Sequence, residues 1–210
     1  AAGKGTRMKS RHPKVLHRLA GRPLLDHVLA TTSALPAHRC WVITGHGADA
    51  VESAIAGSGA QPVRQMPQRG TGHAVQQVVP HLADVDAPGS TTLILNGDVP
   101  LIAAGTAQAL VDACGGTRLA LLTIVLPDAT GYGRIVRAGG SADGAVLGIV
   151  EHKDASPAQR QIREVYTGMM AAPTALLRRW VMALTDDNAQ KEFYLTDIVA
   201  MAVAEGVPVV

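Results

Sequence analysis

The sequence contains few aromatic residues and little cysteine. Phe, Tyr and Trp together make up 3% of the 210 residues, so the core must consist mainly of Ala, Val, Leu and Ile. The two cysteines, Cys40 and Cys114, are far apart and lack the close spacing of metal ligands. Their scarcity argues against a disulfide scaffold and a zinc centre. It favours two reduced thiols in a cytoplasmic protein.

Long apolar runs and an excess of one charge are also missing. No apolar run reaches the roughly 20 residues that a membrane-spanning helix needs. Lys and Arg number 19 against 17 Asp and Glu, a net charge of +2. This balance argues against nucleic acid or an acidic membrane as the main partner. The sequence has no secretory leader and begins inside a glycine-rich segment, so we expect a fragment that lacks its first strand.

Short apolar runs alternate with longer helical patterns in the first half of the chain. Strands are expected at 40–44, 92–95 and 119–126. Helices are expected at 23–35, 48–56, 71–82 and 104–114. This alternation predicts an α/β protein with a doubly wound, mainly parallel sheet.

The second half is richer in β-structure. Strands at 134–137 and 146–151 flank a Gly/Ser-rich turn and predict a hairpin, and a further strand is expected at 164–171. Helices are expected at 174–184 and 194–204. We interpret residues 1–210 as one domain. Residues 1–126 form its nucleotide-binding half, and residues 127–210 form a smaller, β-rich half for a second substrate.

The glycine-rich segment at the N-terminus suggests an anion-binding loop. Gly3 and Gly5 allow tight turns whose N–H groups face one anion, while Lys4 and Arg7 add positive charge. Lys14 follows shortly after. The spacing matches neither the Walker loop nor the dinucleotide fingerprint. The pattern favours a triphosphate cradle, and a solvated surface loop is the alternative.

Asp98 is the candidate metal ligand. It follows the expected strand 92–95, and ligands of open α/β sheets bind at the carboxyl ends of strands. Mg²⁺ commonly combines one or two carboxylates with phosphate oxygens and waters. The alternative is a turn or helix-capping aspartate.

Gln65 and the segment Gly70-Thr71-Gly72 form a third feature. A side-chain amide and free backbone N–H groups can recognise the edge of a base, although an ordinary helix start also explains the glycines. The scattered histidines share no spacing with a nucleophile or a cysteine pair, so we predict no catalytic triad.

These features occur together with several longer strings, and with them the chain resembles the sugar-1-phosphate nucleotidylyltransferases. More narrowly, it resembles the N-terminal domain of the bacterial bifunctional N-acetylglucosamine-1-phosphate uridylyltransferase/glucosamine-1-phosphate acetyltransferase family. The strings that carry this resemblance are AAGKGTRM at 1–8, PKVLH at 13–17, GTGHA at 70–74, GYGRI at 131–135, IVEHKDA at 149–155, NAQ at 188–190 and YLTD at 194–197.

The resemblance implies a Rossmann-like nucleotidyltransferase fold that joins UTP to N-acetylglucosamine-1-phosphate with Mg²⁺. Arg7 and Lys14 would be the catalytic residues acting on the phosphates. The nucleotide would contact Ala1, Ala2, Gly3, Lys14, Gln65, Gly70, Thr71, Asn96, Gly97 and Asp98. The sugar would contact Gly133, Glu151, Tyr166, Tyr194 and Thr196.

The chain also departs from the family pattern. Tyr166 stands where the family has Asn, which affects the sugar site. The family's second metal ligand would lie beyond Val210, so the fragment is expected to lack it. A left-handed β-helix acetyltransferase domain would also follow, and a homotrimer is expected only for a chain that carries it.

Three functions remain open at this level. The first is synthesis of UDP-N-acetylglucosamine for cell-wall and lipopolysaccharide precursors, in the cytoplasm. The second keeps the chemistry with another sugar-1-phosphate. The third is a nucleotide-binding paralogue without turnover.

Overall fold

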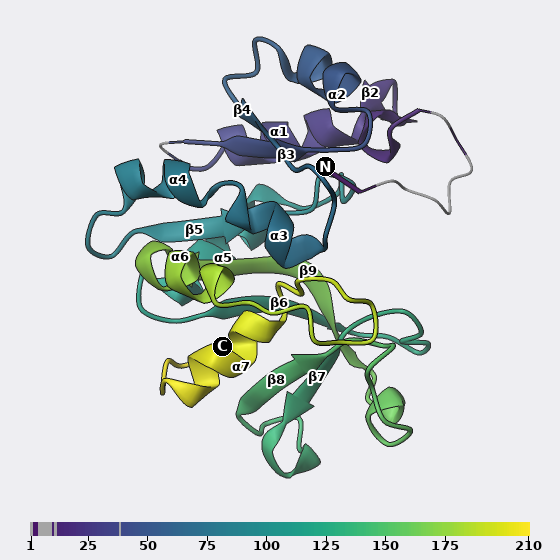
Figure 1. The fold of residues 1–210 in the computed structure, drawn as a ribbon, viewed down its shortest axis with the longest axis vertical. Coiled ribbons are helices and arrows are strands. Elements are labelled where there is room, and N and C mark those ends of the chain that lie inside the picture. Colours follow the sequence, from purple (N-terminus) through teal and green to yellow (C-terminus); the bar gives the residue numbers. More distant parts are fainter. Residues whose placement is uncertain (1, 4–9, 11, 38) are drawn as a thin grey trace.

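The computed structural model describes residues 2–3, 10, 12–37 and 39–210. The predicted site residues Ala1 and Arg7 lie outside this part, as do Lys4 and Gly5 of the predicted cradle. Within it, helices and strands alternate along the chain as the sequence predicted (Figure 1).

The strands of the described residues form three sheets. A hairpin pairs β1 with β2, the parallel pair β3–β4 forms a second sheet, and five strands form the third. Their bounds are β1 Arg18–Leu19, β2 Arg22–Pro23, β3 Trp41–Thr44, β4 Gln61–Arg64, β5 Thr91–Ile94, β6 Ala120–Val125, β7 Arg134–Arg137, β8 Val146–Val150 and β9 Glu164–Pro173.

The helices pack around these sheets. Their bounds are α1 Leu24–Ser33, α2 Ala48–Ile55, α3 Thr71–Gln76, α4 Val79–Leu82, α5 Ala104–Cys114, α6 Thr174–Met182 and α7 Asp197–Ala204. Short 3₁₀ turns lie at Lys14–Leu16, Ala83–Val85, Ala138–Gly140 and Gln159–Gln161. Helices α1 and α2 lie with β3 and β4 at one end of the molecule, and β7 and β8 lie at the other (Figure 1).

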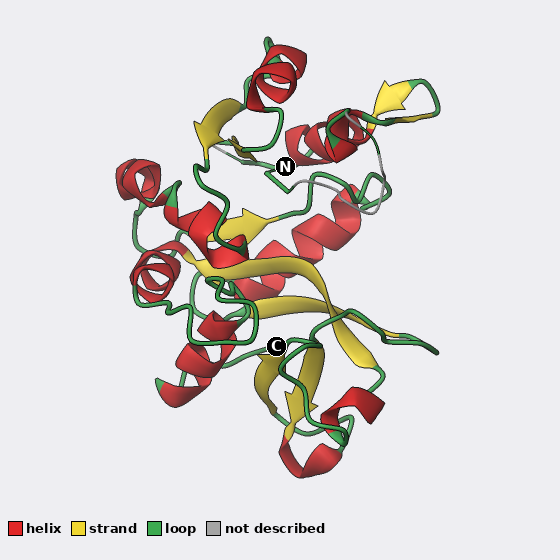
Figure 2. Cartoon of the chain, turned by 45° about the vertical axis from the view of Figure 1, so that its right-hand side comes forward, coloured by secondary structure: helices red, strands yellow, loops and turns green. Residues whose placement is uncertain are grey.

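The α/β class predicted from the sequence is confirmed, but the strand directions are more mixed than expected. The pair β3–β4 is parallel, whereas β9 runs antiparallel to β5, β6 and β7. The long strand β9 crosses the middle of the molecule, as Figure 2 shows from a second side. Strand β9 therefore pairs with strands from both halves of the chain, β5 and β6 from the first and β7 from the second.

Most element bounds agree with the sequence pattern, with three differences. The helix expected at 71–82 divides into α3 and α4. The helix expected from 194 begins at Asp197, because residues 193–195 bond to Arg69 and to the first residues of α3, Thr71 and Gly72. Strands β1, β2 and β4 were not predicted: β1 and β2 are two residues long, and β4, with Pro62 in its middle, offers little periodicity.

The largest core cluster lies under the five-stranded sheet, between β9, α6 and α7. Trp180, Met170 and Ile198 are almost fully buried there. A second cluster packs α1 and α2 against β3, and a third packs α5 against β6 and β9. As the composition predicted, aliphatic side chains fill most of these clusters.

A cavity of about 590 Å³ separates the sheet β3–β4 from the five-stranded sheet. Its walls are mostly apolar and include Val28 of α1, Ile43 of β3, Leu93 of β5 and Val111 of α5. Among the described residues, no ladder joins β3 to β5 across it.

No helix within the described ranges has the length and apolar character needed to cross a membrane.

Candidate active site

Asp98 and Lys14 meet at the carboxyl end of β5. The Lys14 Nζ forms an ion pair with the Asp98 Oδ2, and the two side chains are 40% and 29% exposed. Lys14 begins a 3₁₀ turn that is anchored by the buried Val15 and Leu16. The predicted phosphate-binding lysine and metal-binding carboxylate are therefore neighbours, and both remain accessible to a ligand.

Asn96 extends this site toward β9. Its Nδ2 donates a hydrogen bond to the Thr167 carbonyl at 3.3 Å. Gly168 next to it has a φ of +89°, and a Cβ there would collide with the Asn96 amide. A residue without a side chain is therefore needed where Asn96 meets β9. This contact brings the β5 end beside Tyr166.

Gln65 stabilises the Gly70 turn through its buried side-chain amide. It is 2% exposed, and its Nε2 donates to the Gly70 carbonyl at 2.9 Å and lies 3.1 Å from the His73 Nδ1. Burial lowers the pKa of His73, which favours the neutral ring that can accept this bond. The Gln65 amino group is thus engaged within the chain. A role in reading a base remains a prediction.

The Gly70 turn binds the segment before α7. The Gly72 N–H donates to the Phe193 carbonyl at 2.8 Å, and the Leu195 N–H donates to the Thr71 Oγ1 at 3.0 Å. These bonds place the residues predicted for the base beside those predicted for the sugar.

Ala2 and Gly3 lie near the end of β3. Ala2 is buried and its carbonyl accepts the His46 N–H at 3.2 Å, while Gly3 is exposed with open space around its α-carbon. The Gln68 side chain donates to the Gln65 carbonyl at 3.3 Å and lies against Gly45, which is next to Ala2. Ala2, Gln65 and the Gly70 turn that Gln65 contacts therefore lie close together.

Glu151 is the centre of the predicted sugar site. Its Oε1 accepts a hydrogen bond from the Thr196 Oγ1 at 3.0 Å. Burial raises the pKa of Glu151, and the nearby Asp154 carboxylate adds to this increase. The main chain of Gly133 faces the same carboxylate, since a Cβ on Gly133 would lie 3.5 Å from Oε1.

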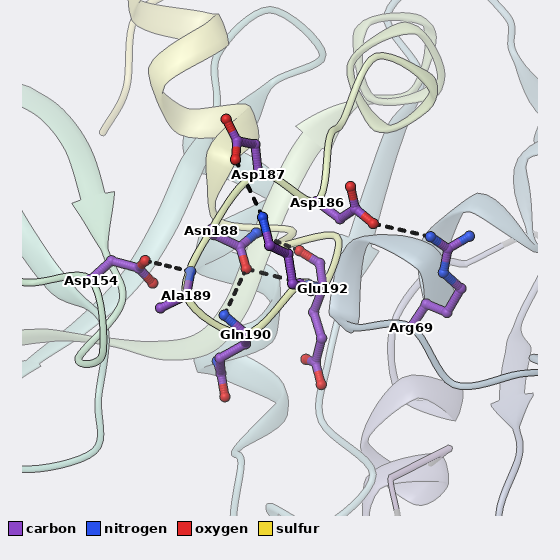
Figure 3. A network of polar contacts seen from close by, with 9 residues as sticks. Arg69, Asp154, Asp186, Asp187, Asn188, Ala189, Gln190 and Glu192 are labelled. Atoms are coloured by element: carbon purple, nitrogen blue, oxygen red, sulfur yellow. Dashed lines mark hydrogen bonds and ion pairs between the residues drawn. The ribbon is translucent and has the colours of Figure 1, made fainter.

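Tyr194 forms hydrogen bonds with Gln190 and with Asp154, the carboxylate near Glu151. Its hydroxyl donates to the Asp154 Oδ2 at 3.1 Å and accepts from the Gln190 Nε2 at 2.8 Å. Asp154 also accepts the Ala189 N–H at 2.9 Å, and Figure 3 shows it reaching the loop 186–192. Arg69 approaches this loop from the other half through Asp186, at 3.1 Å.

Tyr166 lies inside the main core cluster and is 8% exposed. Its N–H donates to the Gly133 carbonyl at 2.9 Å, and burial together with the Glu151 carboxylate raises the pKa of its hydroxyl. Within the described residues this buried hydroxyl has no hydrogen-bond partner. The sequence left open whether the side chain faces the sugar site or the core. It is packed in the core, with Glu151 nearby.

Several polar residues of this region, Asp154, Asn188 and His73 among them, were not assigned a role from the sequence. Asp154 and Asn188 lie in strings that supported the resemblance, and His73 follows the Gly70 turn. Asn188 organises its loop by donating to the Glu192 carbonyl at 2.6 Å. Their partners are distant in sequence or in irregular loops, so no local periodicity reveals them.

The metal prediction rests on Asp98. Among the described residues, no group of three or more His, Cys, Asp or Glu side chains could enclose a metal ion. A half-exposed carboxylate at a strand end still suits Mg²⁺, because that ion keeps waters and takes phosphate oxygens as further ligands. The residues present therefore fit a metal that arrives with a nucleotide.

Solved structures with the same architecture define the class of protein. The chain aligns with a UDP-glucose pyrophosphorylase complexed with UDP-glucose at a TM-score of 0.74 and 14% identity, covering 98% of this chain and 85% of that one. A nucleotidyl transferase from Methanothermobacter thermautotroptrophicus aligns at a TM-score of 0.63 and 21% identity, covering 100% and 82%. The chain has the nucleotidyltransferase fold.

Residues 1–164 match the family model of the MobA-like NTP transferase domain, and the chain belongs to this family. It is 68% identical to the bifunctional protein GlmU of Methylibium petroleiphilum and 63% identical to that of Paracidovorax citrulli. All of the chain aligns in both comparisons, against 46% and 44% of the two relatives. The chain thus spans about half the length of these curated relatives.

Proposed function

We propose that the chain is the uridylyltransferase part of a longer protein and forms UDP-N-acetylglucosamine and pyrophosphate from UTP and N-acetylglucosamine-1-phosphate. The observation that carries this proposal is a set of contacts that runs from the Lys14–Asp98 pair, through Asn96 and Thr167 on β9, to Tyr166 and Gly133 beside Glu151 and Thr196. It spans the two halves assigned to the nucleotide and the sugar. The high identity to two proteins named GlmU supports the same assignment.

The reaction is a nucleotidyl transfer. An oxygen of the sugar 1-phosphate bonds to the α-phosphorus of UTP, and the bond from that phosphorus to the oxygen bridging the β-phosphate breaks. Pyrophosphate leaves with that oxygen. Such transfers depend mainly on positioning and charge neutralisation, which fits a site without a nucleophilic side chain.

Each half of the site has a distinct task in this proposal. Lys14 and Arg7 neutralise phosphate charge, and the Gly70 turn binds the base with Gln65 as its support. Gly133, Glu151, Tyr194 and Thr196 hold the sugar. Mg²⁺ bound at Asp98 would neutralise further negative charge on the phosphates.

A direct assay tests the proposal. The intact protein is incubated with Mg²⁺, UTP and N-acetylglucosamine-1-phosphate, and pyrophosphate and the UDP-sugar are quantified. We expect stoichiometric formation of both. UTP binding without any pyrophosphate release, over a panel of sugar phosphates, would instead identify a binding paralogue.

Tyr166 supports a second candidate within the same chemistry, the use of another sugar-1-phosphate. Its buried hydroxyl lies near Glu151, where the family has the amide of Asn. We expect Tyr166→Asn to lower the KM for N-acetylglucosamine-1-phosphate by up to about tenfold, the value of one hydrogen bond, and to leave the KM for UTP unchanged. An unchanged sugar-phosphate KM would show that this position in the core does not affect the sugar site.

The organisation of the longer protein is also part of the proposal. Residues 1–126 form the nucleotide half and residues 127–210 the sugar half of one domain. A strand that leads into Ala2 would fill the cavity between β3 and β5, whose walls are mostly apolar. We place the reaction in the cytoplasm, and any trimer in a β-helix part outside this chain.

A further inference from the structure

Arg134 is a fully buried arginine at the start of β7. It is 1% exposed, and no carboxylate of the described residues lies within ion-pair distance of it. Arginine remains charged in proteins, so burying it without a carboxylate is costly. This cost implies that the buried guanidinium has a structural or functional role.

The guanidinium joins two segments of the chain. Its Nη1 donates to the Tyr132 carbonyl, and its Nη2 lies 3.3 Å from the His152 Nδ1. Nε is buried and has no partner among the described residues. All hydrogen bonds of this side chain thus go to the loop before β7 and the turn after β8.

Each of these two segments contains a predicted sugar-binding residue directly next to the residue that Arg134 contacts. Gly133 follows Tyr132, and Glu151 precedes His152. The two face each other closely, because a Cβ on Gly133 would lie 3.5 Å from the Glu151 Oε1 and 2.8 Å from the Ile149 Cγ2. The β7–β8 ladder pairs Arg134 with Val150 next to these two residues, and the Arg134 side chain adds the contacts to the flanking loop and turn.

We propose that Arg134 is a positioning residue that clamps the 131–133 loop to the 151–155 turn and so fixes the sugar site. The two ends of the guanidinium span the gap with a rigid, planar group, which a lysine cannot reproduce. The identity of the ligand, a sugar phosphate, rests on the proposed function. The clamp itself rests on the contacts of Arg134.

Variants of Arg134 test the clamp by steady-state kinetics with both substrates in the intact protein. We expect Arg134→Met to raise the KM for the sugar phosphate about tenfold or more, since small misplacements of a site are costly, and to change the KM for UTP by less than about twofold. Arg134→Lys should give an intermediate sugar-phosphate KM. Arg137→Met, on the same strand but paired with Glu164 at 2.7 Å, is the matched control and should alter neither KM.

His152 provides a second test that keeps the arginine. His152→Asn retains an acceptor near the position of Nδ1 and should keep a near-normal KM for the sugar phosphate. His152→Leu removes the acceptor and should raise this KM as Arg134→Met does. If Arg134→Met does not fold, the His152 pair and Arg134→Lys decide the question.

Amide hydrogen exchange tests the proposed Arg134 clamp without an activity measurement. The N–H of Tyr132 donates to the Ala129 carbonyl at 3.2 Å, and those of Asp154 and Ala155 donate to the Glu151 carbonyl, each at 3.0 Å. These three amides should exchange faster in Arg134→Met than in Arg137→Met. If wild type makes no UDP-sugar, the proposed function fails while exchange still tests the clamp. Unchanged exchange of these amides in Arg134→Met, or equal changes in the KM values for UTP and the sugar phosphate, would overturn the proposed clamp.

Discussion

At the scale of single residues, the site contains two carboxylates in different surroundings. Asp98 is half exposed and paired with Lys14, whereas Glu151 is more buried and lies near a second carboxylate, Asp154. The first arrangement suits a charged ligand. The second makes an ionised carboxylate costly, because burial removes its hydration.

Replacement of Asp98 tests the metal assignment. Asp98→Ala in the intact protein should lower Mg²⁺-dependent pyrophosphate release by orders of magnitude, because one ligand of a charge-neutralising metal is lost. UTP should still bind weakly, as measured by calorimetry. The control Asp143→Ala removes an exposed carboxylate from the β7–β8 turn and should leave turnover unchanged. Near-normal turnover of Asp98→Ala would remove this residue from the mechanism.

Glu151 gives a pH-dependent prediction. Burial raises its pKa in the folded state, so the folded protein binds this proton more tightly than the unfolded chain. The ionised carboxylate therefore destabilises the fold at neutral pH, and this penalty disappears as the pH falls through the raised pKa. Glu151→Gln keeps an acceptor for Thr196 without the charge. Its free energy of unfolding should exceed that of wild type at neutral pH, and the difference should shrink on acidification.

Glu164 is the matched control, because its pKa is shifted in the opposite direction to that of Glu151. Its hydrogen bonds from Arg137 hold the pKa of its carboxyl below the ordinary value. Glu164→Gln should therefore be less stable than wild type at neutral pH, and this deficit should vanish as the pH falls through the lowered pKa. Urea denaturation at several pH values measures both variants. A Glu151→Gln difference that does not change with pH contradicts the assignment.

At the scale of elements, β9 is the strand that connects the two halves. It pairs with β5 and β6 of the first half and with β7 of the second. Its existence was predicted from its apolar run, but its central position was not. Pairing partners depend on which distant strands meet, and a local run of residues contains no such information.

Gly168 tests the contact between β9 and Asn96. Gly168→Ala should displace Asn96 and cost about 1 kcal/mol or more, because a Cβ would occupy the space of the amide at a positive φ. UTP affinity should fall with it. Gly148→Ala on β8 meets nothing within 4 Å and is the control. Thermal unfolding and calorimetry compare the two, and equal behaviour would show that the close approach of Asn96 is unimportant.

At the scale of the whole molecule, a cavity of about 590 Å³ with mostly apolar walls lies between β3 and β5. Strand β3 lines this cavity, and Ala2 lies near the end of β3, which supports a strand that leads into Ala2 and lies beside β3. A version of the protein with the residues encoded upstream of Ala1 should unfold at a higher temperature. Burying two aliphatic side chains would add about 3 kcal/mol or more, a shift of roughly 6–12 °C for a chain of this size.

The control for this experiment is an extension of equal length made of Gly and Ser. It lengthens the chain without supplying apolar side chains to the cavity walls. Equal melting temperatures for the natural and the Gly/Ser extensions would leave the cavity unassigned, and the proposal of a filling strand would be withdrawn.

The sequence by itself determined the α/β class, most element bounds and the identity of the strand-end Asp98. These features depend on local periodicity, turn residues and short motifs, which involve residues close together in the sequence. Only the tertiary structure decided that Lys14 meets Asp98, that Tyr166 packs in the core and that Arg134 joins the 131–133 loop to His152. Each of these contacts depends on strand register and long-range packing, where a shift of one residue moves a side chain to the opposite face.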